Sequence, residues 1–260
     1  MGRRRWTLMA TSKIRIESVD KIYNANNKKR FQALKNVSAD IKENEFVCIV
    51  GPSGCGKSTL LRMLAGLDFP TGGKIYFDNE EIVGPSAQRG MVFQSYTLFP
   101  WMRVGDNIRF GLKLKGIPKN EQLDIVNHYL KVIGLESFEK SYPKELSGGM
   151  KQRVAIARAL ANSPDVLLMD EPFGALDPNT KASMQLLMRN IWQNTKQTIV
   201  FVTHDIEEAV FLSTKIIVMS AAPGRIAKIV DVDLPEEREL SLKDTQEFIE
   251  IRKQINGIIH

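Results

Sequence analysis

Short apolar runs recur along this chain, and each ends in glycine or a polar residue. They cover residues 46–50, 166–169, 198–202 and 216–219. Continuous apolar runs of this length are typical of strands that are buried on both faces of a parallel sheet. Segments with apolar residues at helical spacing lie between them, over residues 58–67, 154–160 and 184–192. The alternation predicts an α/β fold in which helices cover a parallel sheet.

Three further segments refine this picture. Residues 14–23 alternate weakly and predict a strand, and residues 75–77 predict another that turns back at Asp78-Asn79. Residues 104–140 are rich in helix formers and are interrupted by Gly116 and Pro118, so we expect a small helical subdomain there.

The last part of the chain predicts one amphipathic helix. It follows Pro235, and residues 241–244 resemble a capping box. Apolar residues then recur at helical spacing at Phe248, Ile251, Ile255 and Ile258. The polar positions carry both signs of charge, so we expect this helix to dock on the core and not on a membrane.

Composition narrows the class of protein. The 260 residues are 43% hydrophobic, with 36 basic and 30 acidic side chains and a net charge of +6. The longest apolar run is residues 46–50, whereas a membrane-spanning helix needs about 20 apolar residues, so any membrane role is expected to need a partner. Two cysteines, Cys48 and Cys55, are too few for a disulfide framework and favour a reducing compartment.

The first apolar run leads directly into a phosphate-binding loop. Its pattern is complete over Gly51, Pro52, Ser53, Gly54, Cys55, Gly56, Lys57, Ser58 and Thr59. Glycines let successive backbone N–H groups point at phosphate oxygens, and the helix that follows adds its positive end. Lys57 supplies a compact charge for the β- and γ-phosphates, and the Ser58 hydroxyl is a ligand for Mg²⁺. A kinase, a GTPase or a transport ATPase would fit this loop equally well.

A second apolar run ends in two acids, Asp170 and Glu171. In the same sheet as a phosphate loop, Asp170 is expected to hold the Mg²⁺ shell. Glu171 is placed to act as a general base on water near the γ-phosphate. Two acids at a strand end can also serve only as caps of the next helix.

The segment Ser147-Gly148-Gly149-Met150 opens another predicted helix, where backbone N–H groups and a hydroxyl can bind an anion. Together with residues 153–160 it resembles the nucleotide-binding subunits of ATP-binding-cassette transporters. In that family the turn binds the γ-phosphate of the nucleotide held by the partner subunit. The resemblance therefore implies nucleotide contacts for Ser147, Gly148 and Gly149. Met150 replaces the usual glutamine, and the phosphate-contacting residues Ser147 and Gly149 are intact.

Four single residues match further family positions. Tyr23 matches the aromatic residue that stacks on adenine, although a tyrosine in a strand can also be an ordinary core or surface residue. Gln94 matches the loop glutamine that senses Mg²⁺ and water, and Asp177 lies in the loop that crosses the dimer seam. His204 matches the switch histidine that contacts the γ-phosphate, whereas a lone histidine at a strand end is usually a polar cap.

Residues 14–229 contain every expected motif once and in order. The resemblance implies an α/β fold with a P-loop (RecA-like) parallel sheet core, an N-terminal antiparallel β subdomain and a small α-helical subdomain. The cassette domain is expected at residues 12–235, with the helical subdomain inserted at about 96–150, and a helical tail at 236–260.

The resemblance also implies partners. ATP and Mg²⁺ would be bound between this chain and a second copy of itself or a homologous cassette subunit. Closure around ATP and reopening after hydrolysis would drive integral membrane permease subunits, and indirectly a solute-binding protein, from the cytoplasmic face of the bacterial inner membrane. Segments 88–94, 98–101 and 223–226 resemble importers of the nitrate, sulfonate, taurine and bicarbonate group. Cargo contacts lie in other subunits.

The main alternative is a soluble cassette ATPase that acts on DNA or on ribosomes. The DNA-repair type carries a long coiled coil between its ATP motifs, for which residues 104–140 are too short and irregular. The ribosome-acting type usually has two cassettes per chain. No basic stripe with interleaved aromatics is visible, so we expect no nucleic acid partner. A P-loop kinase, a second alternative, would not need the Ser147 motif.

Overall fold

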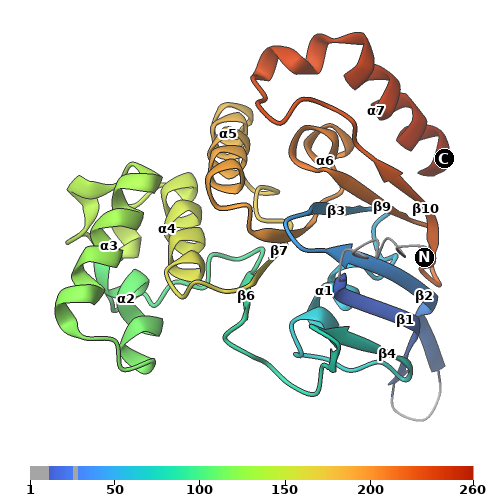
Figure 1. Cartoon of the computed structure of the whole chain (residues 1–260), viewed down its shortest axis with the longest axis horizontal. Helices are drawn as coiled ribbons and strands as arrows, with labels where there is room; N and C mark the ends of the chain where they lie inside the picture. Colours follow the sequence, from blue (N-terminus) through green and yellow to red (C-terminus); the bar gives the residue numbers. More distant parts are fainter. Residues whose placement is uncertain (1–11, 26–28, 260) are drawn as a thin grey trace, which may run out of the picture.

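A six-stranded sheet forms the centre of the molecule (Figure 1), seen in a computed structural model that describes residues 12–25 and 29–259. Its strand order is β10-β9-β3-β8-β7-β6, and all strands are parallel except β10, which is antiparallel to β9. The strands are β3 (Phe46–Val50), β6 (Arg89–Val92), β7 (Val166–Asp170), β8 (Thr198–Val202), β9 (Lys215–Met219) and β10 (Ile226–Asp231). Every residue of β3 and β8 is buried, as the continuous apolar runs predict.

A second, antiparallel sheet with the order β2-β1-β4-β5 covers one face of the core. Its strands are β1 (Ser12–Ala25), β2 (Lys29–Lys42), β4 (Gly72–Phe77) and β5 (Glu80–Glu81). The predicted turn joins β4 to β5, and Asp78 and Asn79 both have positive φ there (48° and 66°). Such angles match the tight hairpins in which Asn and Asp are favoured.

Seven α-helices are described: α1 (Lys57–Leu64), α2 (Val104–Leu114), α3 (Lys119–Ile133), α4 (Gly148–Leu160), α5 (Pro178–Thr195), α6 (Ile206–Leu212) and α7 (Gln246–Ile259). Alternate residues of β3 divide the core between two layers. Val47 and Ile49 pack with α1 and the antiparallel sheet, whereas Phe46, Cys48 and Val50 pack with α5, α6 and α7. This placement follows from the two-residue period of a strand.

Helices α2, α3 and α4 form a lobe to one side of β6 and β7 (Figure 1). It has its own apolar core, which includes Ile108, Val126, Leu130 and Val154. The parallel core, the antiparallel sheet and this helical lobe confirm the predicted fold class. None of the helices in residues 12–25 and 29–259 has the length and apolarity that crossing a membrane requires.

The start predicted for the tail helix is wrong. Residues Leu240–Asp244 form a 3₁₀ helix, and α7 begins only at Gln246. Thr245 provides the cap, because its Oγ1 accepts a hydrogen bond from the Phe248 backbone N–H at 3.4 Å. Phe248 and Ile255 are fully buried, so the predicted docking on the core is confirmed. Residue 260, the end of the predicted tail, lies outside the described residues.

Candidate nucleotide site

Four neighbouring parallel strands carry the predicted phosphate and metal residues at the same edge of the sheet. The phosphate loop follows β3, His204 follows β8, Asp170 and Glu171 lie at the end of β7, and Gln94 follows β6. The order β3-β8-β7-β6 makes these four strands adjacent. Carboxyl ends of parallel strands are where open α/β sheets bind ligands.

The phosphate loop has the backbone that only glycine adopts without strain. Gly54 and Gly56 have φ of 77° and 93°, and α1 begins at the next residue, Lys57. A Cβ built on Gly56 would lie 2.6 Å from Cδ2 of Leu34, so the loop also packs too tightly for a side chain there. Its backbone N–H groups and the start of α1 therefore form a concave anion-binding site.

Lys57 is buried at the base of this loop, with 6% of its surface exposed. Its Nζ donates hydrogen bonds to the carbonyl oxygens of Gly51 (2.8 Å) and Pro52 (3.0 Å). Within the described residues it forms no ion pair with a carboxylate. Nζ also lies 3.9 Å from Cys55 Sγ. A buried ammonium whose partners are all neutral fits an incoming anion. The neighbouring Cys55 thiol is also buried, and burial raises its pKa, so it is neutral at pH 7.

The predicted metal ligands Ser58 and Asp170 are in contact. Ser58 Oγ donates a 2.7 Å hydrogen bond to Asp170 Oδ1. Burial raises the pKa of Asp170, an effect that the Ser58 hydrogen bond partly opposes and the Glu171 charge reinforces. A hydroxyl beside a half-buried carboxylate matches the hard oxygen ligands that Mg²⁺ takes together with phosphate oxygens. The residues present therefore fit a Mg²⁺–nucleotide complex.

Glu171 and His204 also lie together. His204 Nδ1 is 3.1 Å from Glu171 Oε2, and the imidazole is 59% exposed. Glu171 has φ of 42°, a left-handed conformation that a non-glycine residue adopts at a cost of about 1–3 kcal/mol. Its backbone N–H is held by the Val202 carbonyl at 3.0 Å, which links this acid to the end of β8.

Gln94 is exposed on the loop after β6, and Arg158 of α4 anchors the residues that follow it. Arg158 Nη1 donates to the Thr97 carbonyl at 2.8 Å, and Nη2 donates to Thr97 Oγ1 at 2.9 Å. Burial lowers the pKa of Arg158, which stays charged at neutral pH. The Gln94 loop is therefore attached to the helical lobe.

Tyr23 lies on β1, in the antiparallel sheet, and is 40% exposed. Its hydroxyl donates to Asp68 Oδ2 at 2.8 Å, and Lys21 Nζ lies 4.9 Å from the ring centroid. The ring is thus fixed by its neighbours and still presents surface. Its stacking on adenine stays a prediction.

Ser147 and Asp177 are not on the sheet edge but begin two helices. Ser147 Oγ accepts a hydrogen bond from the Met150 N–H (3.3 Å) at the start of α4, and Asp177 Oδ1 accepts one from the Thr180 N–H (3.0 Å) at the start of α5. Both caps are exposed. A Cβ built on Gly149 would lie 2.4 Å from Cγ2 of Thr180, so the two helix starts touch.

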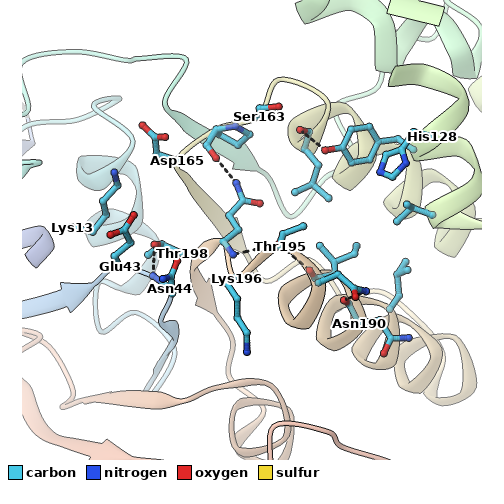
Figure 2. A pocket seen from close by; sticks show the side chains of 18 residues that line it. Lys13, Glu43, Asn44, His128, Ser163, Asp165, Asn190, Thr195, Lys196 and Thr198 are labelled. Atoms are coloured by element: carbon cyan, nitrogen blue, oxygen red, sulfur yellow. Dashed lines mark hydrogen bonds between the residues drawn. The ribbon is translucent and has the colours of Figure 1, made fainter. Parts of the chain in front are cut away.

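A separate cleft of about 720 Å³ lies at the opposite edge of the sheet (Figure 2). Its lining includes Asn44 before β3, Asp165 before β7 and Thr198 at the start of β8, which mark the amino ends of the strands. His128 of α3 and Asn190 of α5 border it from the other side. It contains none of the predicted site residues.

Asp205, which no nucleotide-site motif singles out, sets the geometry beside His204. It caps α6 by accepting from the Glu208 N–H at 3.1 Å and forms a 2.6 Å ion pair with Lys181 of α5. The signal was present in the chain, because an aspartate followed three residues later by a glutamate is typical of a helix start.

These features define a phosphate-loop nucleotide-binding protein. A match to the ABC transporter family covers residues 34–174, which is more than half of the chain. The chain is 52% identical over 247 residues to an uncharacterized ABC transporter ATP-binding protein of Methanocaldococcus jannaschii, covering 95% of this chain and 91% of the relative. It therefore belongs to the ABC transporter family, and it is an ATP-hydrolysing subunit that uses ATP with Mg²⁺.

Two relatives have more specific names. The chain is 51% identical over 233 residues to the nitrate import ATP-binding protein NrtD of Synechocystis sp., with 87% of this chain and 88% of that protein covered. It is 47% identical over 242 residues to the aliphatic sulfonates import ATP-binding protein SsuB of Bacillus cereus, with 93% and 94% covered.

The fold is also similar to a solved dimeric ATP-binding cassette in a post-hydrolysis state, bound to ADP and Pi. The TM-score is 0.75 at 36% identity, and the match covers 85% of this chain and 100% of that chain. This likeness agrees with the fold class drawn from the sequence.

Proposed function

We propose that this chain powers an importer of a small oxyanion, of the nitrate or aliphatic sulfonate type, by closing as a dimer around ATP and reopening after hydrolysis. The observation that carries the proposal is the convergence of Lys57, the Ser58–Asp170 pair and the Glu171–His204 pair at one sheet edge. The cargo class is taken from the names of the two importer relatives.

Each predicted residue has a distinct role in this proposal. The phosphate loop and Lys57 bind the phosphates, and Ser58, Asp170 and Gln94 hold Mg²⁺ and its water shell. Glu171 accepts the proton of the water that attacks the γ-phosphorus. His204 orients the Glu171 carboxylate through the 3.1 Å contact.

The exposure of three predicted site residues supports the proposed dimer. Ser147, Asp177 and His204 all lie on the surface, and Ser147 caps α4, a helix start of the kind that can bind an anion. One chain carries each motif once, so a second copy would supply the Ser147 turn to the nucleotide held here. ATP binds the closed dimer better than ADP does, and this difference in affinity would drive the motion.

The docking surface for the permease is proposed near Gln94 and Val104. Phe93 and Trp101 are 36% and 70% exposed there, an unusual placement for large aromatic side chains. The buried Asn107 amide holds the loop between them, accepting from the Phe99 N–H (2.9 Å) and donating to the Met102 carbonyl (3.0 Å). A chain that docks in this way is peripheral to the membrane, at its cytoplasmic face.

Copurification from the native cell in mild detergent tests this assignment. A permease and a solute-binding protein, with ATP hydrolysis stimulated by nitrate or a sulfonate in the reconstituted complex, are the expected results. Recovery of a ribosome or of DNA in place of a permease would contradict the proposal.

A further inference from the structure

Helix α6 begins two residues after His204, at Ile206, and is only seven residues long. A helix of two turns has little stability of its own. The last carbonyl oxygens of any helix also lack partners within that helix. The position of His204 therefore depends on what holds α6 at its two ends.

Two buried arginines hold the carboxyl end of α6. Arg238 Nη1 donates to the carbonyl oxygens of three residues in and just after the helix, and Arg189 Nη1 donates to a fourth. The accepting carbonyls are those of Val210 (3.0 Å), Phe211 (2.8 Å) and Ser213 (3.0 Å) for Arg238, and Leu212 (2.9 Å) for Arg189. Four consecutive carbonyls are thus satisfied by side chains from outside the helix.

These guanidinium groups are unusual because they are almost fully buried, at 5% exposed for Arg238 and 1% for Arg189. Burial lowers the pKa of Arg238 to about 9 and of Arg189 to about 10, and the proximity of Arg189 lowers that of Arg238 further. Both are still protonated at pH 7. Positive charge at a helix carboxyl end is favourable.

Arg238 is part of the tail, beyond β10. Its Nε donates to the Pro235 carbonyl at 2.9 Å, which fixes the direction of the side chain. Further along the tail, Lys243 and Arg252 lie 3.1 Å and 3.4 Å from the Glu207 carboxylate of α6. The tail therefore contacts α6 both at its carboxyl end and along its side, and α7 packs against α6 (Figure 1).

The amino end of α6 is fixed from α5. Lys181 pairs with Asp205 at 2.6 Å and lies 3.6 Å from the buried Glu208. His204 precedes this capped turn and reaches Glu171 at 3.1 Å. A shift of α6 along its axis would carry His204 with it.

We propose that Arg238 is a positioning residue for His204: by capping the carboxyl end of α6, the tail sets the imidazole toward Glu171. The kinetic consequence rests on the proposed function, whereas the placement of His204 does not.

The kinetic test uses the full chain. Arg238→Gln removes the fork of donors and leaves the phosphate loop unchanged. It is expected to lower kcat for ATP by about tenfold or more with KM within about twofold. Lys253→Gln, an exposed position on α7, is the control and should keep wild-type values. A folded Arg238→Gln protein with wild-type kcat would overturn the proposal.

A double-mutant cycle separates positioning from a general loss of stability. If Arg238 acts through His204, then Arg238→Gln should change kcat by less than about twofold in a His204→Ala background. Multiplication of the two single losses would show that Arg238 acts independently of His204, and the inference would be wrong.

NMR gives a readout that does not require activity. The chain has three histidines, at positions 128, 204 and 260, so imidazole signals can be assigned by substitution. Arg238→Gln should shift the His204 signal and leave that of His128 in place, and an unmoved His204 signal would refute the placement. If wild type hydrolyses no ATP, the proposed function fails, and this shift still tests Arg238.

Arg238→Lys serves if the glutamine variant does not fold. Lysine keeps the charge but lacks the planar fork that reaches several carbonyls. We expect Arg238→Lys to lower kcat by less than Arg238→Gln does and to displace the His204 signal. Wild-type values of both would overturn the inference.

Discussion

The hydroxyl of Ser58 and the carboxylate of Asp170 are 112 positions apart in the sequence and 2.7 Å apart in space. The contact joins the first turn of α1 to the last residue of β7. Two oxygen ligands that belong to different motifs therefore meet at one point, as a Mg²⁺ site shared with phosphate requires. It follows that metal dependence is the first property to measure.

Asp170→Asn is expected to raise the Mg²⁺ concentration for half-maximal ATP hydrolysis by at least about tenfold, because an amide replaces a charged ligand. The measurement is hydrolysis against free Mg²⁺ at saturating ATP. Asp165→Asn is the matched control, since Asp165 is exposed just before the other end of β7. An unchanged Mg²⁺ requirement in Asp170→Asn would remove this residue from the metal shell.

Glu171→Gln is expected to bind ATP and to hydrolyse it at least about 100-fold more slowly, because glutamine cannot accept a proton from water. ATP should then hold the protein as a dimer, which light scattering after size exclusion detects. The exposed Glu136→Gln is the control for a change of charge alone. Equal turnover by mutant and wild type would show that Glu171 is not the base.

Lys57→Ala is expected to lose most affinity for ATP, about tenfold or more, because it removes the buried ammonium at the base of the phosphate loop. The Gly51 and Pro52 carbonyls would lose their donor as well, so a lower melting temperature is also expected. Titration with a fluorescent ATP analogue measures the affinity. Wild-type affinity in a folded Lys57→Ala protein would contradict the phosphate-loop assignment.

The sequence predicts secondary structure best where a single physical rule determines the pattern of residues. The apolar runs of β3, β7, β8 and β9 predict buried strands because those strands are covered on both faces. Strands β2, β6 and β10 are not predicted by the local sequence pattern. Strand β6 is only four residues long and contains Arg89 and Gly90, so it lacks an apolar run. It is a strand because β7 pairs with it.

The contacts of the tail cannot be predicted from the local sequence for a different reason. Arg238 lies in the charged stretch 236–239, at the start of the predicted helical tail, yet it lies outside any helix and is only 5% exposed. Its three carbonyl partners at the end of α6 lie 25 to 28 positions earlier and become acceptors only when α6 ends where it does. Nothing in the local pattern signals such a partner. The helix start predicted from the capping-box pattern at residues 241–244 is wrong for a similar reason. That segment forms a 3₁₀ helix, and the residue that caps α7 is Thr245.

Low pH should weaken the ion pair and the cap that Asp205 forms at the amino end of α6. Burial raises the pKa of Asp205, but hydrogen bonds from Lys181 and from backbone N–H groups outweigh this and leave it below its ordinary 3.8. A carboxylate whose pKa is lower in the folded than in the unfolded protein stabilises the folded state at any pH above its unfolded-state pKa. That stability is lost as the pH falls through the pKa of the folded state.

The difference in melting temperature between wild type and Asp205→Asn should therefore be largest near pH 6–7 and should shrink below about pH 4. Asparagine still caps a helix, so the substitution tests the charge. The side chain is 34% exposed, so an effect of at most about 1 kcal/mol is expected, or roughly 2–4 °C. Thermal unfolding between pH 3 and 7 measures it, and a difference that does not vary with pH would contradict the assignment.

Two glycines in helices should respond to alanine in opposite ways. A Cβ on Gly149 would lie 2.4 Å from the Thr180 methyl, too close for the two to coexist unless Thr180 or the helix start shifts. Gly149→Ala should therefore push the start of α4 away from α5, destabilise the fold by about 1–3 kcal/mol and lower the melting temperature by roughly 3–10 °C.

Gly257 lies in α7 with nothing within 4 Å of its added Cβ, so Gly257→Ala should leave the melting temperature unchanged or raise it by up to about 2 °C. Scanning calorimetry of both proteins measures the contrast. Since the Ser147 turn begins α4, Gly149→Ala should also lower ATP hydrolysis, whereas Gly257→Ala should leave it intact. Equal stability of the two variants would mean that α4 and α5 are not in the close contact that brings the Ser147 and Asp177 caps together.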